Sequence, residues 1–263
     1  MTLNLHKLAD QVRQVALEAG GYIRTQRDTF GYHMVEVKGI NDLVSHVDRT
    51  SEKMIVTNLH KIMPDAGFIV EEDTLSSRQE YNWIVDPLDG TTNFVHGVPC
   101  YAVSIALETR GLIIAGVVYE VSRNECFWAT KNGGAFMNGN RISVSQRASL
   151  SQSLVATGFP IYNFSRMDSY MHALEYCMRH THGVRRIGAA AADLCYLACG
   201  RVDAFFEYNL NPWDVAAGAL IIQEAGGTVS DFSGGNNWLF EKEIACTNGL
   251  INKEFEIVTG FFN

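Results

Sequence analysis

The pattern of apolar residues changes near residue 150, and this change constrains the fold more than any other feature. Between residues 101 and 130, three segments alternate or run apolar like successive strands, at 101–108, 112–121 and 125–130. No helix-length pattern separates them, which is typical of antiparallel neighbours. Asn138-Gly139 is a strong hairpin-turn signal. The first half is therefore predicted to be an antiparallel sheet with helices on one side.

After residue 150, strands and helices alternate along the chain. Strands are predicted at 153–157, 184–187 and 204–208, and helices at 168–179, 189–199 and 213–225. This alternation indicates a layered α/β arrangement. We therefore predict an α+β protein with two halves, residues 1–150 and 151–263, which share an interface with a site between them.

The N-terminal segment has apolar residues at helical spacing. They run from Leu5 to Ile23 and predict an amphipathic helix that ends near Gly20-Gly21. The segment lacks the hydrophobic core of a signal peptide, and no apolar run in the chain approaches a membrane span.

Charge and cysteine content exclude several classes of partner. The formal net charge is −8, with no run of Lys or Arg longer than two, which argues against nucleic-acid or anionic-membrane binding through bulk electrostatics. The 6 cysteines are scattered without paired spacing and are expected to be reduced thiols. We expect a cytoplasmic protein without nucleic-acid or membrane partners.

The most informative local stretch lies between residues 83 and 97. Trp83-Ile84-Val85 reads as a buried strand, and Asp86 precedes Pro87, so Asp86 is expected in extended geometry at a strand end. Asp89 follows three residues later with the Leu88 carbonyl between the two carboxylates. Hard cations such as Mg²⁺ prefer this mixture of oxygen ligands.

The same stretch also offers an anion site. Gly90 permits an unusual backbone angle, and Thr91-Thr92-Asn93 could open a helix whose free N–H groups suit a phosphate. An ordinary Asp-Pro turn that caps a helix explains these residues as well, because such turns are common.

Six further acidic residues, at four places in the chain, could belong to the same chemistry. Glu71-Glu72-Asp73 follows a short strand at 68–70, Asp48 precedes a helix, and Glu207 lies at a strand end. Asp214 begins a helix whose first turn has small residues, which would let it approach another backbone closely. By residue type alone, a solvated loop and helix caps at Asp48 and Asp214 are equally good explanations.

Other catalytic signatures are missing or accidental. The chain has no Walker loop, dinucleotide fingerprint, G-x-S-x-G or H-E-x-x-H. Cys195 and Arg201 have the spacing of a cysteine-phosphatase loop, but they lie late in a helical pattern. Nucleophilic catalysis by Ser or Cys is therefore poorly supported.

Taken together, these stretches resemble the inositol monophosphatase family of Mg²⁺-dependent, lithium-sensitive phosphatases over nearly the whole chain. The resemblance is carried by F-I-V-E-E at 68–72, W-I-V-D-P-L-D-G-T-T-N-F at 83–94, P-W-D-V-A-A-G at 212–218 and E-A-G-G at 224–227. It implies a layered α-β-α-β-α sandwich of the inositol monophosphatase and fructose-1,6-bisphosphatase type, usually a homodimer. Val70 and Asp73 depart from the family pattern, which puts the loop and the third-metal site in doubt.

The resemblance also implies a metal site with two Mg²⁺ ions and a weaker third. Glu71, Asp86 and the Leu88 carbonyl would hold the first ion, and a third would lie near Glu71. Asp86, Asp89 and Asp214 would hold the second ion, with Asp86 bridging the two. Two such cations can clamp a phosphate, activate water and stabilise the leaving alkoxide.

The remaining roles concern water and substrate. Thr91 would orient the attacking water with support from Asp48, and Glu71 would assist catalysis as a metal ligand. Backbone donors of Gly90 and Thr91 would hold the phosphate, and Glu207 would contact inositol hydroxyls. The substrate positions implied as a set are Asp89, Gly90, Thr91, Gly188, Ala189, Ala190, Glu207 and Asp214.

The implied activity is hydrolysis of a small polyol phosphate, with inositol 1-phosphate as the first choice. Fructose-1,6-bisphosphatase, adenosine 3′,5′-bisphosphatase and histidinol-phosphatase activities occur among similar chains and stay open. A regulatory protein that contacts RNA polymerase is an alternative from another class, because some similar bacterial proteins act in antitermination.

Overall fold

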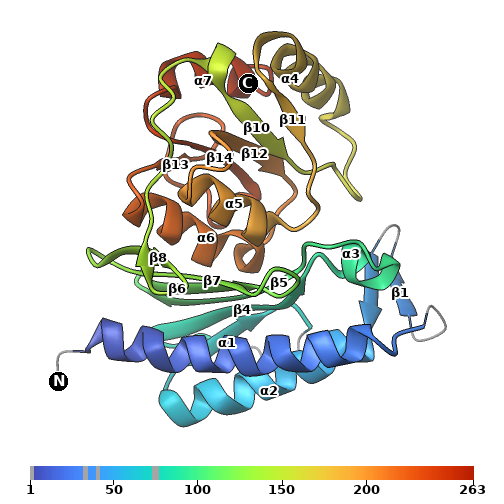
Figure 1. The fold of residues 1–263 in the computed structure, drawn as a ribbon, viewed down its shortest axis with the longest axis vertical. Helices are drawn as coiled ribbons and strands as arrows, with labels where there is room; N and C mark the ends of the chain where they lie inside the picture. The colour runs from blue at the N-terminus through green and yellow to red at the C-terminus, as the bar shows by residue number, and fades with distance from the viewer. Residues whose placement is uncertain (1–2, 32–34, 40–41, 73–76) are drawn as a thin grey trace.

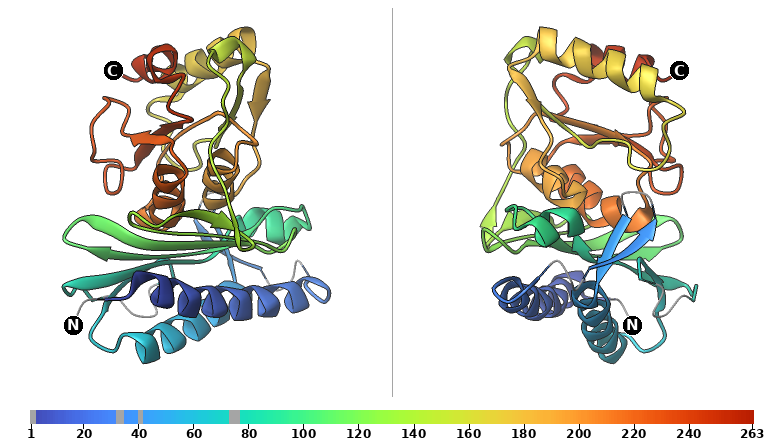
Figure 2. Two further views of the ribbon diagram at one scale, coloured as in Figure 1. Left: turned by 60° about the vertical axis from the view of Figure 1, so that its left-hand side comes forward. Right: turned by 90° about the vertical axis from the view of Figure 1, so that its right-hand side faces the viewer.

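The computed structural model describes residues 3–31, 35–39, 42–72 and 77–263, whose helices and sheets stack in five layers (Figure 1). Helices α1 and α2 form one outer layer, and a seven-stranded sheet lies on them. Helices α5 and α6 form the middle layer, followed by a five-stranded sheet and the outer helices α4 and α7 (Figure 2). The expected α-β-α-β-α sandwich is confirmed.

The larger sheet is built almost entirely from the predicted antiparallel strands. Its spatial order is β3-β4-β5-β6-β7-β8-β9, and only β3 and β4 are parallel. Asn138 and Gly139 form the predicted hairpin turn with φ of 49° and 83°. The strands are β3 Gly67–Val70, β4 Tyr81–Asp89, β5 Ala102–Thr109, β6 Leu112–Glu120, β7 Glu125–Thr130, β8 Gly134–Met137 and β9 Asn140–Arg141.

Alternation along the strands divides the apolar residues between the two faces of this sheet. Trp83 and Val85 pack against α1 (Leu5–Arg27) and α2 (His46–Ile62), whereas Ile84 packs toward the middle layer. The first helix runs past Gly20-Gly21, so its predicted end was wrong. A Cβ at Gly20 would lie 2.3 Å from the Tyr119 ring. This glycine therefore serves close packing on the sheet, not termination of the helix.

The second half has the predicted alternation of strands and helices. The smaller sheet has the order β11-β10-β12-β14-β13, with β10 parallel to both β11 and β12. Its strands are β10 Leu154–Thr157, β11 Gly183–Arg185, β12 Ala204–Tyr208, β13 Thr228–Ser230 and β14 Glu243–Thr247. Its helices are α4 Met167–His180, α5 Ala190–Ala198, α6 Pro212–Glu224 and α7 Asn252–Gly260, with a 3₁₀ turn at Leu150–Gln152.

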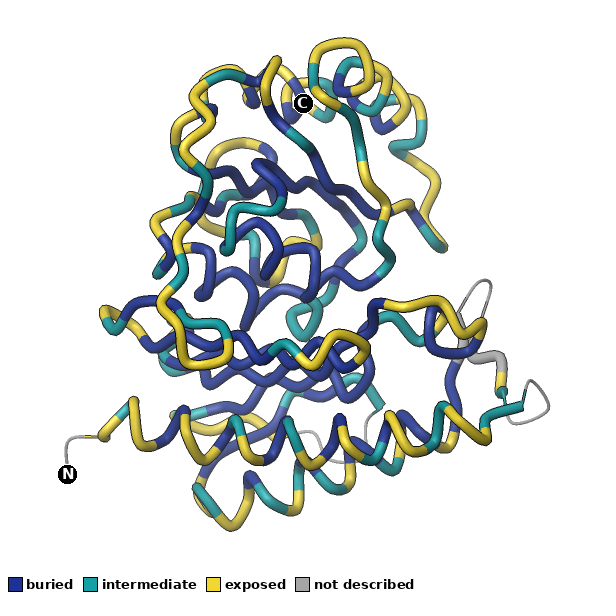
Figure 3. The backbone as a smooth tube through the Cα atoms, in the orientation of Figure 1, coloured by how far each residue is buried: buried dark blue, intermediate teal, exposed yellow. Residues whose placement is uncertain are grey.

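The two middle helices pack closely enough to bring both halves to one site. A Cβ at Gly116 of the larger sheet would lie 3.0 Å from the Ala217 backbone, and a Cβ at Gly218 would lie 2.6 Å from the Leu194 Cβ. The expected close approach of the 213–225 helix is therefore confirmed. Figure 3 shows that α5 and α6 are buried, whereas α1, α2 and α4 each expose one side.

Two smaller features complete the described structure. Strands β1 (Val35–Gly39) and β2 (Asp42–Ser45) form a two-stranded antiparallel sheet that leads directly into α2. Within the described ranges, the chain has no helix with enough length and hydrophobicity to traverse a bilayer.

Candidate metal centre

A bulge at the end of β4 points Asp86 and Asp89 to the same side of the sheet. Asp86 pairs with Ser104 and Asp89 with Ala102, so β4 has one more residue than β5 between these two pairs. In a regular strand, residues three apart face opposite sides, and the extra residue reverses the alternation. Leu88 consequently packs into the core under α1 and α2, while Asp89 turns toward the middle layer.

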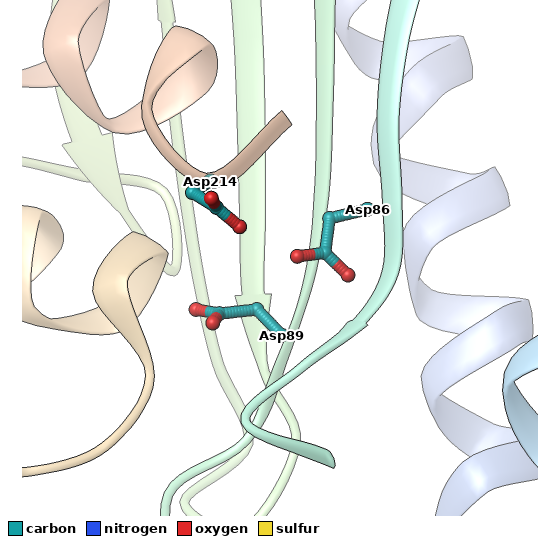
Figure 4. Close-up of side chains that lie close together, drawn as sticks. All are labelled: Asp86, Asp89 and Asp214. Carbon is teal, nitrogen blue, oxygen red and sulfur yellow. The ribbon is translucent and has the colours of Figure 1, made fainter. Parts of the chain in front are cut away.

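Asp214 completes a cluster of three carboxylates from both halves of the chain. One ligand oxygen from each of Asp86, Asp89 and Asp214 lies within 4.8 Å of the others (Figure 4). Asp86 and Asp89 are buried, with exposed fractions of 2% and 8%, and Asp214 is half-buried. The structure therefore brings together the three aspartates that were expected to share a site.

Backbone donors hold each carboxylate of this cluster in place. Asp89 accepts from the N–H groups of Ala190 at 3.2 Å and Ala191 at 2.7 Å, at the start of α5. Asp214 accepts from the N–H of Asn211 at 2.6 Å, and Asp86 from the N–H of Leu88 at 2.9 Å. Asp214 is the third residue of α6, and Asn211 is the N-cap, so Asp214 contributes to capping as well.

The electrostatics of the cluster call for positive charge. Burial, followed by the charges of Glu71, Asp89 and Asp214, raises the pKa of Asp86 well above its usual range. Burial likewise raises the pKa of Asp89 to about 6 and that of Asp214 to about 7. Carboxylates gathered away from water need a compensating cation or protons. An all-oxygen donor set of this kind fits a hard divalent ion.

Glu71 lies beside the cluster at the end of β3. It lines the same cleft as Asp86 and hydrogen-bonds to it, which contributes to the raised pKa of Asp86. The next residue, Glu72, donates its N–H to the Glu52 carboxylate at 2.8 Å, and this contact anchors the chain after β3 to α2. Asp73 lies outside the described residues.

The buried Asp48 and the half-buried Thr91 form a hydrogen-bonded pair behind the cluster. The Thr91 hydroxyl lies 2.9 Å from the Asp48 carboxylate and 2.9 Å from the Leu88 carbonyl. Asp48 also accepts from the N–H and the hydroxyl of Ser45, at 2.9 and 2.7 Å. The alternative explanation of Asp48 as an N-cap was wrong, because α2 starts earlier, with Ser45 as its N-cap and Asp48 at its third position.

Gly90 and the short helix α3 (Thr91–His96) close this side of the site. Gly90 has φ of 86°, and a Cβ there would lie 3.1 Å from the carbonyl oxygens of Cys100 and Gly188. Glycine is therefore required for both the backbone angle and the close approach. Asn93 donates to the carbonyls of Cys100 at 2.8 Å and Ile187 at 2.9 Å, which fixes α3 against the wall formed by residues 188–190.

The predicted site residues line a single cleft of about 140 Å³. Asp48 is the exception, since it reaches the cleft only through Thr91. Glu207 lies on β12 against Gly158, where a Cβ would overlap the Glu207 carboxylate. The predicted residues that line the cleft are Glu71, Asp86, Leu88, Asp89, Gly90, Thr91, Gly188, Ala189, Ala190, Glu207 and Asp214.

Sequence reasoning missed several residues of this cleft. Arg186, Phe159 and Tyr162 line it, and the Arg186 guanidinium lies 5.5 Å from the centre of the Phe159 ring. Asp193 lines it as well, within the apolar run 190–198. A single acidic residue in an apolar helix could have identified Asp193 from the sequence. Loop residues such as Phe159 have no sequence feature that indicates a site.

Comparison with known proteins identifies the family of this chain. Residues 4–259 match the model of the inositol monophosphatase family. The chain is 44% identical over 244 residues to a protein of Neisseria meningitidis named putative Nus factor SuhB (92% of this chain, 91% of that one). It is 41% identical over 242 residues to an inositol-1-monophosphatase of Mesorhizobium japonicum (91% of each). The crystal structure of extragenic suppressor protein suhB from Bartonella henselae superposes with a TM-score of 0.91 at 41% identity, covering 96% of this chain and 98% of that one.

Proposed function

Because the chain belongs to the inositol monophosphatase family, we propose that it is a Mg²⁺-dependent phosphatase that hydrolyses inositol 1-phosphate or a similar small polyol phosphate. The observation that supports this proposal most strongly is that Asp86, Asp89 and Asp214 meet in a cleft that Glu207 also lines. Family membership supports phosphatase activity in general. The arrangement of the cleft supports a small alcohol with a phosphate at the acidic end.

The acidic end has the donors for two Mg²⁺ ions, with a third near Glu71. Glu71, Asp86 and the Leu88 carbonyl would hold one ion, and Asp86, Asp89 and Asp214 the other. Bound Mg²⁺ would neutralise the phosphoryl oxygens, lower the pKa of water and stabilise the leaving alkoxide. The chain's own task is to hold these carboxylates together despite their mutual repulsion.

Thr91 and Asp48 are suited to orient the attacking water. A hydroxyl has one proton, so Thr91 can donate to the buried Asp48 carboxylate and keep its lone pairs for a water in the cleft. Burial raises the pKa of Asp48, which makes it a better proton acceptor through Thr91. Backbone N–H groups of Gly90 and Thr91 would hold the phosphate, and Glu207 with residues 188–190 would position the alcohol.

Phosphate release from inositol 1-phosphate tests the proposal directly. The wild-type protein should be active only with Mg²⁺, and Asp89→Asn should lose at least about 100-fold in kcat. Thr91→Val should lose a similar factor while the protein keeps its Mg²⁺-dependent rise in Tm, whereas Thr91→Ser should recover most activity. Full Mg²⁺-dependent activity in Asp89→Asn would rule out the mechanism.

A substrate panel decides between related activities. The values of kcat/KM for inositol 1-phosphate, fructose 1,6-bisphosphate, adenosine 3′,5′-bisphosphate and histidinol phosphate should be compared in one buffer. The proposal requires the polyol phosphate to rank first. Inhibition by millimolar lithium at limiting Mg²⁺ is also expected, because Li⁺ can replace a weakly held ion, and unchanged activity would count against it.

A second candidate function is contact with the transcription machinery. It is favoured by the names of relatives, which include Nus factor SuhB of Escherichia coli at 39% identity. Co-purification of RNA polymerase with both the wild-type chain and Asp89→Asn would support a role independent of catalysis. A homodimer is also proposed, and light scattering at twice the monomer mass of 29.2 kDa would support it.

A further inference from the structure

Asp193 is a carboxyl buried in the wall of the cleft. It lies on α5 in an otherwise apolar run, its side chain lines the cleft, and only 1% of the residue is exposed. In the part of the chain that the structure describes, its Oδ1 has no hydrogen-bond partner. Such an oxygen costs the fold free energy, so it calls for a partner that comes from outside the chain.

Asp193 lines the same cleft as Glu207. Burial raises the pKa of Asp193 well above its usual range, and the Glu207 charge is the next contributor, ahead of Asp89. The carboxylate cluster of the metal centre does not include it. Both oxygens of Asp89 accept from N–H groups of α5, whereas Oδ1 of Asp193, two residues beyond Ala191, has no hydrogen-bond partner among the residues that the structure describes.

Buried aspartates elsewhere in the chain have the partners that a structural role requires. Asp203 is fully buried and accepts from Ser145, from Arg147 at 2.9 Å and from the N–H of Leu154 at 2.7 Å. Three donors thus compensate the burial of the Asp203 carboxylate. A purely structural role does not explain Asp193.

We propose that Asp193 determines substrate specificity by binding, together with Glu207, two neighbouring hydroxyls of the alcohol that carries the phosphate. The inference rests on the proposed phosphatase function and adds Asp193 as a residue that recognises the free hydroxyls of the polyol. A hydroxyl both donates and accepts, so it can satisfy a carboxyl in either protonation state. A site built around buried hydrogen bonds rejects analogues that lack the hydroxyls.

Two phosphates with the same ring size test the inference. Inositol 1-phosphate offers the hydroxyls, and cyclohexyl phosphate has none besides its ester. Asp193→Ala should lower kcat/KM for inositol 1-phosphate about 10- to 100-fold and that for cyclohexyl phosphate less than about twofold. Asp193→Asn keeps one donor and one acceptor in place, so it should retain most of the preference.

Thermal unfolding without substrate separates this role from a structural one. Asp193→Ala should leave Tm unchanged or raise it, because it removes an unpaired buried carboxyl. Asp203→Ala is the matched control and should lower Tm and reduce both activities by the same factor. If Asp193→Ala lowers both activities equally, or keeps the wild-type preference, the inference is overturned while the phosphatase function stands. A wild-type protein that hydrolyses neither phosphate with Mg²⁺ overturns both.

Discussion

At the scale of single residues, the surroundings of Asp86 disfavour its negative charge. It is 2% exposed, and Glu71, Asp89 and Asp214 raise its pKa in addition to burial. Residues of this kind reduce the stability of the folded chain and are retained at functional sites. The stability of the metal-free protein should therefore improve when this one charge is removed.

The substitution Asp86→Asn tests this expectation. Without divalent cations it should raise Tm by roughly 2–6 °C, because it relieves the repulsion among buried carboxylates. With Mg²⁺ the wild-type protein should gain stability and the variant should gain little. Unfolding followed in EDTA and in Mg²⁺ measures both effects. An equal Mg²⁺-dependent rise in Tm for both proteins would show that Asp86 is not a ligand of the metal.

At the scale of elements, the contact between α5 and α6 determines the width of the metal centre. Asp214 lies on α6, and α5 holds Asp89 through the N–H groups of Ala190 and Ala191. Gly218 has no room for a Cβ, because it lies against Leu194 of α5. One added carbon should therefore push the two helices apart and separate the carboxylates.

Gly218→Ala should reduce both stability and metal affinity. Overpacking should cost about 1–3 kcal/mol in the free energy of unfolding, and the Mg²⁺-dependent rise in Tm should shrink. Gly21→Ala on α1 is the matched control, because a Cβ there meets open space. This helical substitution should stabilise the protein by about 0.5–1 kcal/mol and leave the Mg²⁺ response unchanged. Urea unfolding with and without Mg²⁺ measures both, and equal effects of the two variants would contradict the packing argument.

The turn after β13 depends on one charged side chain and gives a pH-dependent prediction. Burial alone would raise the pKa of Asp231, but hydrogen bonds from Gly235, Ser233 and Asn237 lower it below the usual value. A lowered folded-state pKa stabilises the protein above the unfolded-state pKa of about 3.9 and loses that effect as pH falls through the folded-state pKa. The carboxylate should thus matter at neutral pH and not in acid.

Asp231→Asn should destabilise the protein at pH 7, and the deficit should shrink as pH falls below about 4. The measurement is the free energy of unfolding of both proteins in urea from pH 7 down to the lowest pH at which they fold. A deficit that does not change with pH would mean that the amide replaces the carboxylate fully and that the charge has no role.

At the scale of the whole molecule, the middle layer joins the two halves. Helix α6 packs on β4, β5, β6, β7 and β8 of the larger sheet and on β13 of the smaller one. One apolar cluster contains residues of both sheets and of both middle helices, such as Ile84, Phe205, Leu194 and Ile221. We therefore expect residues 1–150 and 151–263 to unfold together.

Calorimetry tests this expectation of cooperative unfolding. A single transition with equal calorimetric and van't Hoff enthalpies is expected, with and without Mg²⁺. Addition of Mg²⁺ should shift the whole transition upward, because its ligands come from both halves. Two separable transitions, or a shift of only one of them, would show that the halves are independent domains.

The sequence by itself determined the element types and most of the candidate site. Periodic apolar patterns predicted the antiparallel strands and the later alternation, because burial on one face imposes a period of two or 3.6 residues. The resemblance, carried by the motifs at 68–72, 83–94 and 212–218, singled out the acids that the cleft now contains. Local chemistry also identified Gly90, whose backbone angle only glycine adopts readily.

Only the tertiary structure decided how these residues meet. The bulge that turns Asp89 to the side of Asp86 exists through pairing of β4 with β5, and the close contact that requires glycine at position 20 is made with the distant Tyr119 ring. Likewise, only the tertiary structure shows that Oδ1 of Asp193 has no hydrogen-bond partner among the described residues. Local patterns specify what each segment can form, whereas bulges, close contacts and unpaired groups depend on residues far away in the chain.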